Sequence, residues 1–323
     1  MKNFNQKMLV SAFLISACCT KVFAQALLNP LLQPQFVNQL PIPAVVDARG
    51  GGTFNFDITQ FQQNLGLIDP ITKLPLLTTV WGYQGTYPGP TILARSNTPM
   101  QCFWNNKLVD NANKPLPHLL PVDSSIDWAL MDLPNPAQYG VPLVTHLHGG
   151  HTESASDGLP DSWYTPNFTQ KGSGFIKGDR EPYTYSNSQP AATLWYHDHT
   201  MGITRLNAYA GLAGFYIITD ENESTLQANN QLPAGPYDIG LAIQDKTFTA
   251  NGQLFYPSLP PAGTTAPNPS ILPESFGNMI LVNGMVWPVL DVEPRQYRFR
   301  IVNASDSRFY NMALSSGEPI IRL

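Results

Sequence analysis

The feature that most constrains the fold of this chain is a series of short apolar or alternating runs, each broken after a few residues by Gly, Pro or Asn. The 323 residues include 30 prolines and 24 glycines spread along the whole length, and only 13% of the residues are charged. No long stretch carries the helical period of about 3.6 residues, whereas short runs between turn residues are typical of β-strands. We therefore predict an all-β protein, a β-sandwich or barrel, with strands at residues 78–83, 91–94, 100–104, 141–148, 193–199, 211–218, 239–244, 279–282 and 296–302.

A weak internal repeat indicates two copies of one β-domain. The segment 90–106 contains PTILA, MQCFW and Asn106, and the segment 288–303 contains PVLDV, YRFRI and Asn303. Far fewer residues follow Asn303 than follow Asn106 in the first copy, so we expect an incomplete second domain and a chain truncated relative to the protein from which it evolved. The predicted organisation is a signal peptide at 1–24, an extended proline-rich arm at 25–60, a first domain at 61–220, a linker at 221–235 and a partial second domain at 236–323.

The first 24 residues are typical of a secretory signal peptide. Lys2 and Lys7 provide the charged region, an apolar run follows at 8–17, and small residues occupy the cleavage positions before and at Ala24. We expect cleavage after Ala24 and a secreted or periplasmic location. A lipoprotein signal, with lipid attached to Cys18, is the alternative, and the apolar run is shorter than the roughly 20 residues that a membrane-spanning helix needs.

The charge pattern argues against nucleic-acid or membrane-surface binding, because the net charge is −5 and no block of basic residues occurs. Removal of the signal peptide leaves Cys102 as the one thiol, so no internal disulfide is expected. Cys102 lies in an alternating run, which predicts an inert thiol in the core rather than a metal ligand.

Five of the six histidines fall in two tight groups, THLHGGH at 145–151 and WYHDH at 195–199. Residues two apart on a strand project to the same face, so His146 and His148 point together, as do His197 and His199. One such pair alone is often a chance occurrence or a surface pair, but two in a chain this poor in histidine predict a metal site. Several imidazoles favour copper, zinc, iron or nickel, and copper leads because the Cys pairs and the His-Glu-x-x-His helix of zinc sites are missing from the sequence.

The motifs around these histidines closely resemble those of the multicopper oxidases, in particular the bacterial branch with spore-coat laccases and bilirubin oxidases. The resemblance covers nearly the whole chain after the signal and implies a cupredoxin-like Greek-key fold. It is carried by THLHGG at 145–150 with SDG at 156–158, WYHDH at 195–199, TRLN at 204–207, YAGLAG at 209–214, ILVNG at 280–284 and YRFR at 297–300.

By resemblance, His146 is a ligand of the type 2 copper, and His148, His197 and His199 are ligands of the type 3 copper pair. The family couples the oxidation of phenols, bilirubin-like pigments or metal ions to the four-electron reduction of dioxygen to water. Its other ligands come from a His-Pro-x-His-Leu-His and a His-Cys-His segment of a third domain, and neither occurs in this sequence. The resemblance thus implies that the type 1 site and half of the cluster ligands are absent.

Two functional hypotheses follow. In the first, the chain is part of a laccase-like oxidase that uses dioxygen and a small reducing substrate, and a missing carboxyl-terminal domain or a complementary chain completes the site. In the second, it is a catalytically inactive copper-binding cupredoxin fragment that holds the metal through four histidines.

The remaining polar residues near the motifs have more than one interpretation. Asp157 matches an acidic residue that relays protons to the cluster in the family, although an Asp-Gly turn gives the same sequence. Asp198 alternates with two predicted ligands, so we expect it to point away from the metal and to fix an imidazole or a neighbouring strand. His151 lies beyond two glycines, outside the expected ligand set, and His118, in a proline-rich loop, is expected at the surface.

Overall fold

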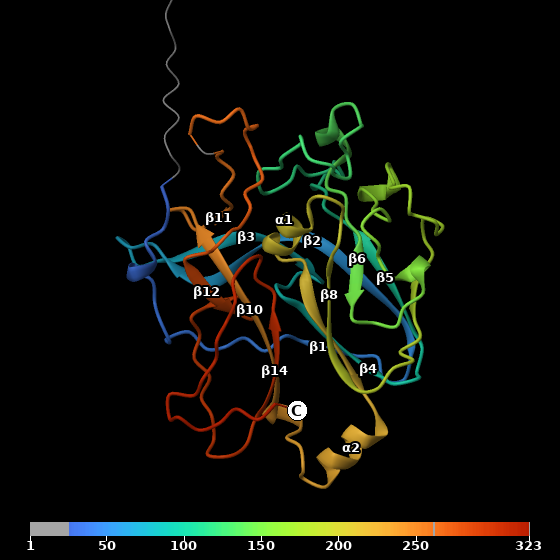
Figure 1. Ribbon diagram of the computed structural model, residues 1–323, viewed down its shortest axis with the longest axis vertical. Helices are drawn as coiled ribbons and strands as arrows, with labels where there is room; N and C mark the ends of the chain where they lie inside the picture. The colour runs from blue at the N-terminus through green and yellow to red at the C-terminus, as the bar shows by residue number, and fades with distance from the viewer. Residues whose placement is uncertain (1–25, 261, 323) are drawn as a thin grey trace, which may run out of the picture.

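The structure, a computed structural model, describes residues 26–260 and 262–322, so the predicted signal peptide at 1–24 lies outside the described residues. Two sheets form the first part of the fold (Figure 1). One has the order β1 (Val45–Asp47), β4 (Gly89–Arg95), β9 (Ala213–Thr219), β8 (Ala192–Asp198) and β6 (Thr145–His148). The other has the order β3 (Pro75–Tyr83), β2 (Gly52–Ile68), β5 (Met100–Asn106) and β7 (Tyr183–Tyr185).

A core rich in aromatic rings joins the two sheets. Trp104 of β5 lies 4.8 Å from Phe56 of β2 and 5.2 Å from Tyr196 of β8, measured between ring centroids. Along β5 the buried positions alternate, with Met100 and Cys102 inside and the residue between them exposed. This period of two explains why the strand was predictable, and it confirms that Cys102 is a core thiol. Burial raises the pKa of this thiol far above its usual range, so it stays protonated.

A third sheet follows, built on β10 (Asp238–Phe248) with β11 (Leu254–Phe255), β12 (Met279–Val282), β13 (Met285–Val286) and β14 (Arg298–Asn303). β10 pairs antiparallel with β12 and parallel with β14, and β2 likewise pairs antiparallel with β3 and parallel with β5. The second segment of the sequence repeat, β5 in one copy and β14 in the other, therefore has an equivalent place in its sheet. Each repeat also ends in the same turn, because Asn106 accepts the amide of Leu108 and Asn303 accepts the amide of Ser305.

The third sheet packs on the ends of β2 and β3. Leu65, Leu67 and Val80 share one buried cluster with Phe248 and Leu281 of the third sheet. Figure 1 shows β10, β12 and β14 on one side of the molecule and β5 and β6 on the other. Within residues 26–260 and 262–322, the sheets thus form one continuous packed body.

Three features differ from the sequence-based expectation or extend it. β2 begins at Gly52, inside the segment that was expected to be an irregular arm. Two short helices, α1 (Thr204–Ala210) and α2 (Glu221–Ala228), interrupt the strands, and α2 begins where the Asp220 side chain accepts the amide of Glu223. Within the part of the chain that the structure describes, five short 3-10 turns lie at Pro30–Leu32, Pro136–Tyr139, Ser154–Ser156, Pro166–Phe168 and Gly235–Tyr237.

Strands predominate over helices, which confirms the all-β prediction. No helix in the described part of the chain has the length and apolar character needed to cross a membrane.

Candidate metal centre

The pairing of β6 with β8 brings the two histidine motifs together. In this antiparallel register His146 lies opposite His197, and His148 lies opposite Trp195. Cross-strand partners and residues two apart share one face, so all of these side chains project from the same side of the sheet. His199 follows the end of β8, and its amide continues the pairing by donating to the carbonyl of Val144. The predicted convergence of the two pairs is therefore a consequence of strand register.

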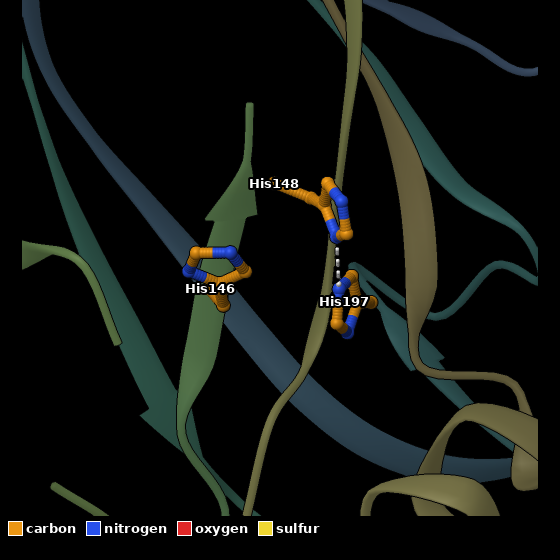
Figure 2. A group of neighbouring side chains, drawn as sticks. All are labelled: His146, His148 and His197. Atoms are coloured by element: carbon orange, nitrogen blue, oxygen red, sulfur yellow. Dashed lines mark hydrogen bonds between the residues drawn. The ribbon is translucent and has the colours of Figure 1, made fainter. Parts of the chain in front are cut away.

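Three imidazoles lie close enough to bind metal together, as Figure 2 shows. His148 Nδ1 is 3.2 Å from His197 Nε2, and His146, His148 and His197 each offer one nitrogen within 4.8 Å of the others. Two nitrogens bound to one tetrahedral ion at about 2.0–2.1 Å lie roughly 3.3 Å apart, so the His148–His197 spacing fits a shared ion. His199 is not in this group of three, but its ring centroid lies 4.9 Å from that of His146.

Backbone carbonyls fix the orientation of two of these rings. His146 Nδ1 lies 2.5 Å from the carbonyl oxygen of Asp157, and His197 Nδ1 lies 2.7 Å from the carbonyl oxygen of Asp198. An N–H at each Nδ1 donates to its carbonyl, so the lone pair of each ring lies on Nε2, the atom through which His197 contacts His148 and through which a metal could be bound. The arrangement selects the tautomer that a ligand needs.

His199 has a buried nitrogen with no protein partner. Its Nδ1 is shielded from solvent, and no hydrogen bond to it occurs within the described residues. Buried polar atoms in native structures are nearly always satisfied by protein, water or an ion. A metal or its bound water in this position would satisfy the atom, so the fourth histidine also fits a metal centre.

Burial keeps the rings of His148, His197 and His199 uncharged at neutral pH. Burial, followed by the charge on neighbouring histidines, lowers the pKa of His148 and of His199. Burial likewise lowers the pKa of His197 to about 3. Only a neutral imidazole binds a metal ion, so at neutral pH these three side chains are already in the ligating form.

Trp195 packs beside the cluster, a role that the sequence analysis did not assign. Its ring lies 4.2 Å from His197 and 5.5 Å from His148, between centroids. Side chains alternate between the two faces of a strand, so Trp195, two residues before His197, lies on the same face as the histidines. The indole therefore forms one wall of the site.

Asp198 points away from the rings, as predicted, and ties the two strands together. Its Oδ2 accepts the amide of Val144 at 3.1 Å and the hydroxyl of Thr200 at 2.9 Å. Its Oδ1 accepts the amide of Thr200 at 3.0 Å and the side-chain amide of Asn207 at 2.8 Å. Burial raises the pKa of Asp198 to about 7, against the lowering effect of these donors.

The other candidate residues take different places. His118 is only partly exposed, which corrects the prediction of a surface residue: its ring packs edge-on against Trp81, with centroids 4.8 Å apart, and Nε2 lies 2.9 Å from Asn207 Oδ1. His151 is exposed and lies beside the carbonyl of Ser188, apart from the group of three. Asp157 follows a 3-10 turn, and its Oδ1 lies 3.6 Å from His146 Nδ1.

Comparison with known proteins gives one consistent result. A family profile described as "Multicopper oxidase" matches residues 125–223, a range that contains all four histidines. The chain is 44% identical over 294 residues to a laccase of Bacillus stratosphericus, an alignment that covers 90% of this chain and 53% of the relative. It is 42% identical to a laccase of Bacillus subtilis (strain 168) over the same share of each chain. The chain therefore spans about half the length of these curated relatives.

The same similarity extends to solved structures. The McoA multicopper oxidase 2F4 variant of Aquifex aeolicus is 28% identical, with a TM-score of 0.55, and the match covers 84% of this chain and 47% of that one. A laccase of Pediococcus acidilactici is 25% identical with a TM-score of 0.56, over 84% of this chain and 47% of that one. These neighbours confirm the predicted cupredoxin-like β-sandwich fold.

Proposed function

The chain belongs to the multicopper oxidase family, and we propose that His146, His148, His197 and His199 hold copper on the common face of β6 and β8. The single observation that carries this proposal is the convergence of the imidazoles, with a nitrogen of His148 3.2 Å from a nitrogen of His197. By resemblance to the family, His146 serves a type 2 copper and the other three histidines serve the type 3 pair.

The donor set favours copper. The group of three consists of imidazoles alone, and imidazole suits copper, zinc, iron and nickel rather than calcium or magnesium. Zinc sites of the structural kind add cysteines, but Cys102, the one cysteine among the described residues, is buried in the core on β5 rather than in this group. Zinc therefore remains the competitor that the experiment has to exclude.

The residues around the histidine cluster would support redox chemistry at bound copper. Copper bound here would supply the electron transfer that reduces dioxygen to water, as in the complete family reaction. The carbonyls of Asp157 and Asp198 hold the rings of His146 and His197 with Nε2 available. The Asp157 carboxylate, with Oδ1 3.6 Å from His146 Nδ1, would orient water or relay a proton beside the proposed type 2 copper.

The sequence supplies four of the histidines that the family uses, and we propose that turnover needs further ligands from another polypeptide segment. With those ligands the substrates would be dioxygen and a small phenol or pigment. Alone, this chain would be a copper-binding cupredoxin unit without oxidase activity. We propose a secreted or periplasmic location, where copper and such substrates meet.

The test is copper loading of the purified chain from Gln25 onward, without the predicted signal peptide. Copper and zinc content, visible absorption and the oxidation of a phenolic dye are measured for the wild type and for a His148→Ala, His197→Ala double variant. We expect bound copper without an intense blue band, lost in the double variant and retained in a His151→Ala control. Copper that survives the double substitution, or a preference for zinc, would refute the proposed site. An intense blue band with turnover would refute the proposal that this chain alone carries only part of the copper ligands.

A further inference from the structure

We propose that His118 is a positioning residue for the metal centre, acting through Asn207 and Asp198 on the segment that carries His197 and His199. The inference rests on the proposed function only in taking these histidines as ligands. The side chains form one unbroken line of hydrogen bonds from a loop after β5 to the end of β8.

The direction of each hydrogen bond in this line is determined by its chemistry. The Asn207 nitrogen faces two acceptors, Asp198 Oδ1 and the Pro142 carbonyl, so Asn207 Oδ1 faces His118 and the proton of the neutral ring lies on Nε2. His118 Nδ1 then accepts the backbone amide of Leu120 at 2.9 Å, and its 3.1 Å contact with the Leu120 carbonyl oxygen is not a hydrogen bond in this tautomer. Nε2–H then donates to Asn207 Oδ1 at 2.9 Å. This contact holds the Asn207 amide with its nitrogen toward Asp198 Oδ1, 2.8 Å away, and toward the carbonyl of Pro142 at 3.3 Å.

Burial makes this line rigid. Asn207 is fully buried in α1, and Asp198 is 1% exposed. A buried amide or carboxylate that loses a partner keeps its full desolvation penalty, so each member has one stable arrangement. Burial, more than any other effect, lowers the pKa of His118 to about 4, which keeps the ring in the neutral form that the line requires at neutral pH.

The line ends on both strands of the metal site. Asp198 holds the amide of Val144, two residues before His146, and the amide of Thr200, directly after His199. The amide of His199 in turn donates to the Val144 carbonyl at 2.8 Å. A shift of Asp198 would therefore move His197 and His199 relative to β6. His118 fixes Asp198 from a distance by orienting Asn207.

Two substitutions of His118 distinguish the effect of its hydrogen bond to Asn207 from the effect of its aromatic ring. His118→Phe keeps an aromatic ring against Trp81 but cannot donate to Asn207, whereas His118→Gln provides an amide N–H at the far end of the side chain. His151→Phe is the matched control, because His151 is exposed and outside the line. Circular dichroism checks that each variant is folded.

Two measurements on the full chain test the proposal. With Cu(II) as the probe, we expect His118→Phe to bind about tenfold more weakly with an altered EPR spectrum, and His118→Gln to stay within about twofold of wild type. Without metal, we expect amide hydrogen exchange in residues 197–200 to be about tenfold faster in His118→Phe, and unchanged in His118→Gln and His151→Phe.

The outcomes are distinguishable. Wild-type exchange in His118→Phe, or equal defects in His118→Phe and His118→Gln, would overturn the positioning role. If the wild-type chain binds no Cu(II), the proposed function fails, and the exchange measurement still decides whether His118 positions this segment.

Discussion

His146 of β6 and His197 of β8 face each other directly across an antiparallel pair, with ring centroids 5.6 Å apart. A shift of this register by one residue would send one histidine pair to the opposite face of the sheet. The metal centre is therefore only as stable as the β6–β8 pairing, and the residues that hold this pairing become targets for tests.

Trp195 should contribute to metal affinity through its contact with His197, 4.2 Å away between ring centroids. An aromatic contact of this kind is worth about 0.5–1.5 kcal/mol, so Trp195→Ala is expected to weaken Cu(II) binding about fivefold. Isothermal titration calorimetry measures the affinity. Trp195→Phe retains a ring and should bind nearly as well as wild type, while wild-type affinity in Trp195→Ala would show that the indole is a bystander.

Gly158→Ala should disturb the site through the backbone. A Cβ at Gly158 would lie 2.2 Å from the Thr145 carbonyl oxygen, and its φ of +74° is strained for any side chain. The neighbouring Asp157 carbonyl, which orients His146, would have to move. We expect a loss of about 2–3 kcal/mol in the free energy of unfolding, together with weaker copper binding.

Gly50→Ala is the control for this change, because a Cβ there meets nothing within 4 Å. Its free energy of unfolding, from urea denaturation, should lie within about 0.5 kcal/mol of wild type. Equal stability of the two alanine variants would contradict the steric argument at Gly158.

Much of the metal centre was predictable from local sequence, because alternation on a strand is a local property. The spacing of His146 and His148, and of His197 and His199, predicted shared faces, and the position of Asp198 predicted that it points away from the metal. The register that joins the two pairs was not predictable from spacing alone. It depends on pairing between segments about fifty residues apart.

The misinterpreted features have long-range causes. His118 was expected at the surface because its neighbours in sequence are prolines, but its burial comes from Trp81 and Asn207, which are distant in the chain. The start of β2 was hidden because many of its residues are polar, and α1 spans only seven residues, too few for a helical period to be recognised.

The stability of the metal-free chain should fall on acidification, in part because of His118. Its pKa is about 4 in the folded chain and 6.5 as the unperturbed value, so between these values the unfolded chain binds the additional proton. The contribution of His118 to the free energy of unfolding is therefore complete above about pH 6.5 and is lost as the pH falls toward 4. From pH 7 to pH 5 the loss due to this group is up to about 2 kcal/mol.

His118→Gln isolates this contribution, because glutamine does not titrate in this range. Urea denaturation at pH 7 and pH 5 should show a smaller decrease in the variant than in wild type. Parallel decreases would mean that other buried groups account for the pH dependence. His197, with a pKa lowered to about 3, acts in the same direction, whereas Asp198, with a pKa raised to about 7, opposes it, since the folded form holds its proton longer.

Arg300 of β14 should be the most costly ion-pair residue to remove. It is 5% exposed and donates to Asp238 through two hydrogen bonds of 2.7 Å, to Glu223 of α2 at 2.5 Å and to Thr193 of β8 at 3.0 Å. This guanidinium thus connects the third sheet to the strand that carries His197. Arg300→Met would leave the buried Glu223 and the partly buried Asp238 with fewer partners, because Arg298 reaches both but replaces only part of the contact.

We expect Arg300→Met to lower the free energy of unfolding by about 3 kcal/mol, since a buried carboxylate that loses its partner keeps its desolvation cost. Arg95→Met removes an ion pair with Glu221 whose side chains are 46% and 82% exposed, and should cost less than about 1 kcal/mol. Urea denaturation of both variants measures the difference. If the two cost the same, the cluster around Arg300 contributes no more than a surface pair, and the apolar contacts between the sheets alone hold the third sheet against β8.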